Sequence, residues 1–243
     1  MRRGRGRPVR RGNCLVGSPR LHPTDRGTDE SGQGWRYRAG MSLGVRFADM
    51  LQILLIRPGS TDYDQQRRIQ GNLDVPLNAQ GREEVARMID DFRGRQFAID
   101  AVYAPECEPA LQTARTIAEA FDTKLRILEE VRNVNQGLWQ GMSIDEFRLQ
   151  QPKVYRQWQE HPESVCPPEG EMLGEAAERL HVAMSRIFKK HKEGLVAIVA
   201  SEPMATLIRR YIDRGQLGDL WKAAIEAHGR WDLLEVKPEA VPS

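Results

Sequence analysis

Residues 57–81 read RPGSTDYDQQRRIQGNLDVPLNAQG and directly follow the mostly apolar run LQILLI at residues 51–56. A short apolar run bounded by turn residues predicts a buried β-strand. The loop after this strand begins with Arg57 and Pro58. An arginine at the carboxyl end of a buried strand indicates a ligand site, because α/β sheets bind ligands there. A proline beside it is unexpected, since its side chain has no donor, acceptor or nucleophile.

The rest of the chain alternates between helical and strand patterns. We expect helices at about 78–93, 108–121, 143–150, 152–160 and 171–191, another beginning near Pro203, and further strands at 99–103, 124–128, 195–200 and 231–236. This alternation predicts one α/β domain at residues 50–238, a three-layer α/β/α sandwich with a mainly parallel central sheet. Ligands of such sheets bind beyond the carboxyl ends of the strands, so the candidate site comprises loops 57–64, 104–109 and 200–204.

Composition restricts the class of protein. No stretch of the sequence approaches the roughly 18 apolar residues that a membrane span needs. The three cysteines are odd in number and widely spaced, which argues against a disulfide framework or a zinc site. We therefore expect a cytoplasmic protein that requires no metal and no cofactor and contacts no membrane.

Charge divides the chain into two segments. Residues 1–49 hold eleven arginines and four acidic residues, whereas the remainder is net acidic. This Gly/Arg-rich segment lacks apolar periodicity and is predicted to be a disordered basic tail, and residues 239–243 form a second short tail. The GRGRP sequence at residues 4–8 resembles an AT-hook core, so nucleic-acid binding by the N-terminal segment is one alternative. The other is a mis-assigned start, with Met41 or Met50 as the true first residue instead of Met1.

The segment 57–81 resembles the opening of the histidine phosphatase (phosphoglycerate mutase-like) superfamily. That family reads R-H-G-x-T, then R-x-Q-G-x-x-D-x-P-L, then a glycine that opens the first helix. The residues in register here are Arg57, Gly59, Thr61, Arg68, Gln70, Gly71, Asp74, Pro76, Leu77 and Gly81. Further matches lie at 112–114, 137–141 and 168–171. The resemblance covers about residues 51–236 and implies the same three-layer fold.

The resemblance also implies a chemistry that this chain lacks. In the family one histidine carries the phosphoryl group, two arginines and a second histidine stabilise its oxygens, and a carboxylic acid protonates the leaving group. The nucleophile position is Pro58, the second arginine falls on Pro109, the proton donor on Asn133 and the second histidine on Ser201. Only Arg57 of this group is kept. The resemblance therefore implies a catalytically degenerate member, a pseudophosphatase with a binding or regulatory role.

A degenerate site can still bind. The candidate ligand-binding residues are Arg57, Gly59, Thr61, Asp64, Arg68, Gln70, Gly71, Ser201 and Glu202. They would hold a small phosphorylated ligand, and a protein partner is the alternative. Against phosphate binding, the same loops carry several carboxylates: Asp62, Asp64, Glu106, Glu108 and Glu202.

A competing hypothesis is an active phosphatase or phosphoglycerate mutase-type enzyme with a relocated nucleophile. None of the five histidines, which are His22, His161, His181, His191 and His228, falls on a predicted site loop. Cys107 does, but the Cys-x5-Arg pattern of a cysteine phosphatase fails, because Thr113 stands at the arginine position. We expect Ser201 or Glu202 to cap the helix that Pro203 begins. Glu129 or Glu130 could act as proton donor only if their loop carries an insertion.

Overall fold

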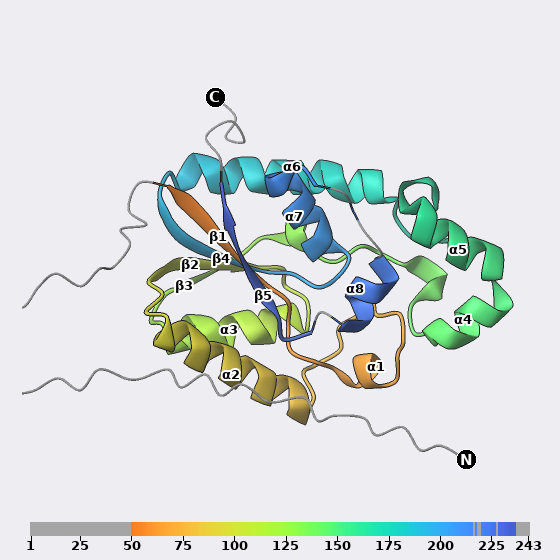
Figure 1. Cartoon of the computed structure of the whole chain (residues 1–243), viewed down its shortest axis with the longest axis horizontal. Coiled ribbons are helices and arrows are strands. Elements are labelled where there is room, and N and C mark those ends of the chain that lie inside the picture. The colour runs from red at the N-terminus through yellow and green to blue at the C-terminus, as the bar shows by residue number, and fades with distance from the viewer. Residues whose placement is uncertain (1–49, 216, 218–219, 227, 237–243) are drawn as a thin grey trace, which may run out of the picture. The chain divides into compact units, whose positions relative to one another are not determined.

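The computed structural model describes residues 50–215, 217, 220–226 and 228–236 (Figure 1). The predicted tails at 1–49 and 239–243 lie outside these residues. Within the described part, no helix is both long enough and apolar enough to cross a lipid bilayer.

A five-stranded sheet forms the centre of the domain. Its strands are β1 (Leu51–Ile56), β2 (Ile99–Ala104), β3 (Lys124–Ile127), β4 (Gly194–Val199) and β5 (Trp231–Glu235). They lie in the order β3-β2-β4-β1-β5. The first four are parallel, whereas β5 runs antiparallel to β1. The predicted α/β fold with a mainly parallel sheet is confirmed.

Helices cover both faces of this sheet (Figure 1). One face carries α2 (Ala79–Gly94) and α3 (Ala110–Ala120), and the other carries α6 (Leu173–Lys190) and α7 (Met204–Asp213). The shorter elements are α1 (Asp62–Gln65), α4 (Ile144–Gln150), α5 (Pro152–Glu160), α8 (Leu220–Glu226) and the 3-10 turns Glu129–Val131, Gly137–Trp139 and Pro162–Ser164. The sequence patterns predicted all the long helices and missed α1 and α8.

The apolar run of β1 is continuous because both of its faces are buried. Ile53 and Leu55 belong to the core under α6 and α7, whereas Leu54 and Ile56 belong to the core under α2 and α3. Alternate side chains of a strand point to opposite faces of the sheet. A strand with a helical layer on each side therefore needs apolar residues at consecutive positions.

Strand register brings the three predicted site loops to one edge of the sheet. Ile56 of β1 pairs with Val199 of β4, and Tyr103 of β2 pairs with Ile198. The loops that follow these strands therefore begin side by side. Because β5 is antiparallel, its first residue, Trp231, also lies opposite Ile56. The segment preceding β5 thus reaches the same edge.

Two glycines of the 57–81 segment allow close backbone contact between the β1 loop and α2. A Cβ atom on Gly81 would lie 2.1 Å from the carbonyl oxygen of Ser60, and one on Gly59 would lie 2.3 Å from that of Gly81. Both distances are far below van der Waals contact. The backbone itself is the obstacle, so neither glycine tolerates a side chain without a shift of the loop.

We predict that Gly81→Ala lowers the free energy of unfolding by about 1–3 kcal/mol, the usual cost of overpacking. Gly94 in the same helix is the matched control, since a Cβ there meets nothing within 4 Å. Gly94→Ala should leave stability unchanged or raise it by up to about 1 kcal/mol, because alanine favours helix. Urea denaturation of both variants checks this. Equal effects of the two changes would contradict the close contact.

Candidate functional site

One cavity lies where the loops after β1, β2 and β4 meet. The residues that line it include all the degenerate catalytic positions predicted from the sequence. They also include all the predicted ligand-binding residues except Thr61, which is buried. The structure thus brings together residues that are up to 145 positions apart, such as Arg57 and Glu202. The wall also includes Gln136 and His228, which the sequence patterns did not indicate. Ligand binding by these residues stays a prediction.

The cavity is small. Its volume is about 70 Å³, whereas small-molecule sites usually enclose about 300 Å³ or more. The apolar part of the wall includes Pro58, Pro109 and Pro203. The enclosed space therefore admits only a group of a few atoms.

Arg57, the one charged group kept from the family pattern, is buried and paired with two carboxylates. Its Nε donates to Glu202 Oε1 at 3.0 Å, and its Nη1 contacts Asp232 Oδ2. Arg209 contacts the same oxygen of Asp232. Burial alone would raise the pKa of Asp232, but the hydrogen bonds and charges of the two arginines outweigh burial and lower this pKa below its ordinary value. The charge of Arg57 is thus already balanced within the protein.

Glu202 also caps helix α7. Its Oε2 accepts hydrogen bonds from the backbone N–H of Thr206 at 3.0 Å and from the Thr206 hydroxyl at 2.7 Å. The helix begins at Met204, and its first-turn N–H groups need such acceptors. The structure therefore assigns the predicted capping role to Glu202, and this carboxylate uses both of its oxygens.

The amides of the β1 loop are likewise satisfied internally. The N–H of Gly59 donates to Thr113 Oγ1 at 3.3 Å, that of Ser60 to Glu84 Oε2 at 2.8 Å, and that of Thr61 to Asp64 Oδ2 at 2.6 Å. Two of these three acceptors are carboxylates. Anion binding by this loop would have to break these bonds.

Asn133, at the proton-donor position, connects three segments of the site. Its Nδ2 donates to the carbonyl oxygens of Gly71 and Glu202 at 2.8 and 2.7 Å, and its Oδ1 accepts from the N–H of Met204 at 3.3 Å. An amide has both donors and an acceptor, so one side chain can bond to both N–H and C=O groups. Asn133 therefore fixes the backbone around Glu202 and supplies no acid.

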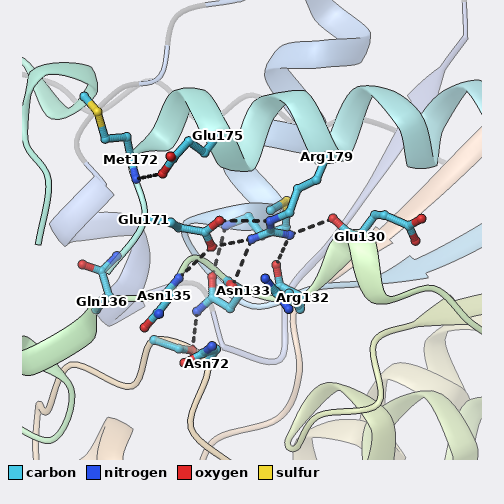
Figure 2. Close-up of polar contacts among 12 residues, drawn as sticks. Asn72, Glu130, Arg132, Asn133, Asn135, Gln136, Glu171, Met172, Glu175 and Arg179 are labelled. Carbon is cyan, nitrogen blue, oxygen red and sulfur yellow. Dashed lines mark hydrogen bonds and ion pairs between the residues drawn. The ribbon is translucent and has the colours of Figure 1, made fainter. Parts of the chain in front are cut away.

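The loop that carries Asn133 is held by Arg179 of α6. Figure 2 shows the Arg179 guanidinium directed at this loop, where it donates to the carbonyl oxygens of Glu130, Arg132 and Asn133 at 2.7, 2.8 and 3.2 Å. It also pairs with Glu171 at 2.7 Å. These bonds connect α6 to the loop that contributes Asn133 to the cavity wall.

The alternative proton donors lie elsewhere. Glu130 pairs with Arg186, and Glu129 accepts from the N–H of Glu106 at 2.7 Å. Neither glutamate lines the cavity. Within the described residues, no group of three or more His, Cys, Asp or Glu side chains could hold a metal ion.

The loop after β2 shows the same kind of capping as the loop after β4. Glu108 Oε2 accepts from the N–H of Gln112 in the first turn of α3 at 3.1 Å, just as Glu202 accepts from Thr206. In both loops a glutamate precedes a proline and satisfies the N–H four residues further on. In the family these two loops carry the second arginine and the second histidine, whereas in this chain they carry the carboxylates of Glu108 and Glu202.

Cys107 is not an activated thiol. Burial raises its pKa to about 12, and hydrogen bonding to Asp74 and the nearby charges of Asp74, Glu129 and Glu108 act in the same direction. Its Sγ contacts the carbonyl oxygens of Glu108 and Asn72 at 3.4 and 3.5 Å. Reactive cysteines have lowered pKa values, so this environment disfavours a thiolate nucleophile.

His228 is a second site residue that the sequence patterns missed. It lines the cavity, and the N–H of its neighbour Gly229 donates to the carbonyl oxygen of Pro58 at 2.9 Å. Its Nε2 lies 3.2 Å from Asp64 Oδ1 but outside hydrogen-bond geometry, so this contact is an ion pair only when the ring is protonated. The antiparallel direction of β5 brings His228 here, and no local motif indicates that direction.

The comparisons with known proteins identify the family of this domain. A family model described as histidine phosphatase superfamily (branch 1) matches residues 53–241. The chain belongs to this superfamily.

Two curated proteins illustrate the similarity. The chain is 32% identical over 154 residues to phosphoglycerate mutase-like protein 4 of Arabidopsis thaliana, covering 62% of this chain and 66% of the relative. It is 26% identical over 151 residues to phosphoserine phosphatase 1 of Hydrogenobacter thermophilus, covering 62% and 71%. The match thus spans about two thirds of these relatives.

A solved structure shows the same fold. The structure titled Bacillus stearothermophilus YhfR superposes with a TM-score of 0.67 at 24% identity, over 79% of this chain and 98% of that one.

We predict slow alkylation of Cys107. At pH 8 a thiol with a pKa near 12 has far less than a tenth of its molecules as thiolate, the reactive form. Cys166 is exposed and serves as the internal control. Peptide mapping after brief iodoacetamide treatment should find Cys166 modified and Cys107 unmodified. Modification of Cys107 at an equal rate in the folded protein would contradict the raised pKa.

Proposed function

We propose that this protein is a catalytically inactive member of the histidine phosphatase superfamily, a cytoplasmic pseudophosphatase that acts by binding a partner. The observation that carries the proposal is the convergence of four changed positions on one cavity. Pro58, Pro109, Asn133 and Ser201 all line it. None of them brings an imidazole, a guanidinium or a carboxylic acid to the chemistry that the family performs.

The nucleophile is the most consequential loss. Pro58 is buried, and its carbonyl oxygen accepts from Gly229. A proline cannot form the phosphorus–nitrogen bond that phosphohistidine chemistry requires. Oxyanion stabilisation is also weakened, because Arg57 already pairs with Glu202 and Asp232.

The same pairing favours a protein partner over a phosphorylated small ligand. A site for a multiply charged phosphate needs unbalanced positive charge. Here the buried arginine is balanced, and the loop amides donate to groups of the protein itself. A regulatory role through protein contacts is therefore the form of the proposal that we adopt.

A relocated nucleophile is the competing hypothesis, and His228 is the one histidine among the cavity-lining residues that the structure describes. Two observations weigh against it. The Nε2 atom of His228 is buried and faces Asp64. The neighbouring Arg57 is neutralised by Glu202 and Asp232, so it cannot balance the charge of a phosphoryl group at this imidazole.

The test is turnover of p-nitrophenyl phosphate by the full chain, followed by a trap for acid-labile phosphohistidine. We expect no turnover above a buffer blank and no phosphohistidine, because Pro58 stands at the nucleophile position and Arg57 is already paired with carboxylates. Pro58→His should stay inactive, since the second arginine and second histidine are still missing.

His228→Asn and Arg57→Ala are the diagnostic variants, with folding checked by circular dichroism. Turnover by the unmodified chain that both variants abolish would overturn the proposal and identify His228 as the relocated nucleophile. Turnover that neither variant changes would indicate a contaminating phosphatase, to be removed by further purification before the measurement is repeated.

A further inference from the structure

We infer that Glu202 is a built-in anion. Its carboxylate occupies the oxyanion position of this site and determines which charge the site admits. The inference rests on the proposed function and deepens it, because it names the class of ligand that the site excludes and the residue responsible.

The donors around Glu202 are those that bind a phosphate oxygen. Oε1 accepts from the guanidinium Nε of Arg57 at 3.0 Å, and Oε2 accepts from the backbone N–H and the hydroxyl of Thr206 at 3.0 and 2.7 Å. Guanidinium groups and the N–H groups of a helix N-terminus are common anion ligands in proteins. Here the anion that they bind is covalently part of the chain.

Burial shows that this arrangement is built into the fold. The side chains of Arg57 and Glu202 are only 7% and 4% exposed. A buried carboxylate or guanidinium is tolerated only when it is paired and hydrogen-bonded. Each side chain therefore requires the other, and the pair excludes a second anion from the same donors.

The backbone of Glu202 is held as firmly as its side chain. Asn133 bonds to the Glu202 carbonyl oxygen on one side and to the Met204 N–H on the other. Arg179 in turn donates to the carbonyl oxygen of Asn133 (Figure 2). A shift of the Glu202 backbone would thus require the supporting loop to move as well.

Charge then decides the ligand class. An incoming phosphate would meet the carboxylate of Glu202 where it needs a cation, and like charges at contact repel strongly in a buried site. Asp232 balances the other end of the Arg57 guanidinium. The structure therefore assigns exclusion of anions to Glu202, and removal of this one charge should convert the site into a phosphate site.

The experiment measures the melting temperature of the full chain with inorganic phosphate or with chloride at equal ionic strength. Glu202→Gln keeps the side-chain size and removes the charge. We expect it to melt lower than the unmodified protein in chloride and to gain several degrees in phosphate. Its apparent phosphate affinity should be at least about tenfold higher than that of the unmodified protein, which phosphate should not stabilise.

Glu108→Gln is the matched control. It makes the same change in the other Glu-Pro pair, whose carboxylate bonds to Gln112 of α3. Phosphate should not raise its melting temperature. Glu202→Asp keeps the charge and should also show no gain. Equal phosphate gains in Glu202→Gln and Glu108→Gln would overturn the inference.

A folding defect in Glu202→Gln leaves the inference testable. If the variant folds in phosphate but not in chloride, phosphate has replaced the carboxylate, which supports the inference. If it folds in neither salt, while the double variant Arg57→Gln/Glu202→Gln folds, phosphate does not replace the carboxylate as the partner of Arg57. The inference is then wrong. Turnover by the unmodified chain would instead refute the proposed function, so the two failures are distinguishable.

Discussion

The buried guanidinium of Arg57 is the constraint on which the site depends. A charged group at 6% exposure must have partners within the protein. Those partners, Glu202 and Asp232, come from the two strands that flank β1 in the sheet. Glu202 follows β4 and Asp232 lies in β5. The strand order therefore places one carboxylate on each side of the arginine.

This arrangement gives the site a structural role. Removing one member of a buried ion pair typically costs about 3–5 kcal/mol, because the other charge stays buried and unpaired. Loss of either Arg57 or Glu202 alone should therefore destabilise the fold. Recovery of catalysis would need a nucleophile at Pro58 and the missing arginine and histidine, in addition to removal of the Glu202 charge.

The changed positions support one another. Asn133 bonds to the backbone on both sides of Pro203, and Glu108 and Glu202 each satisfy an N–H in the first turn of a helix. These bonds satisfy polar groups of the site loops within the protein itself. The site is thus closed by the protein's own polar groups, which explains why so small a cavity remains between loops that the fold brings together.

The framework could be predicted from local sequence: the apolar runs of β1 and β4, the amphipathic helices and the motif at residues 57–81. These features are local, so spacing along the chain reveals them. The sequence also predicted which loops form the cavity wall, since parallel strands end at a common edge. The ion-pair partners of the charged groups at that edge could not be predicted in the same way. Arg57 pairs with Glu202 and Asp232 because the strand order brings together residues more than a hundred positions apart. His228 lies in the cavity wall because β5 runs antiparallel to β1.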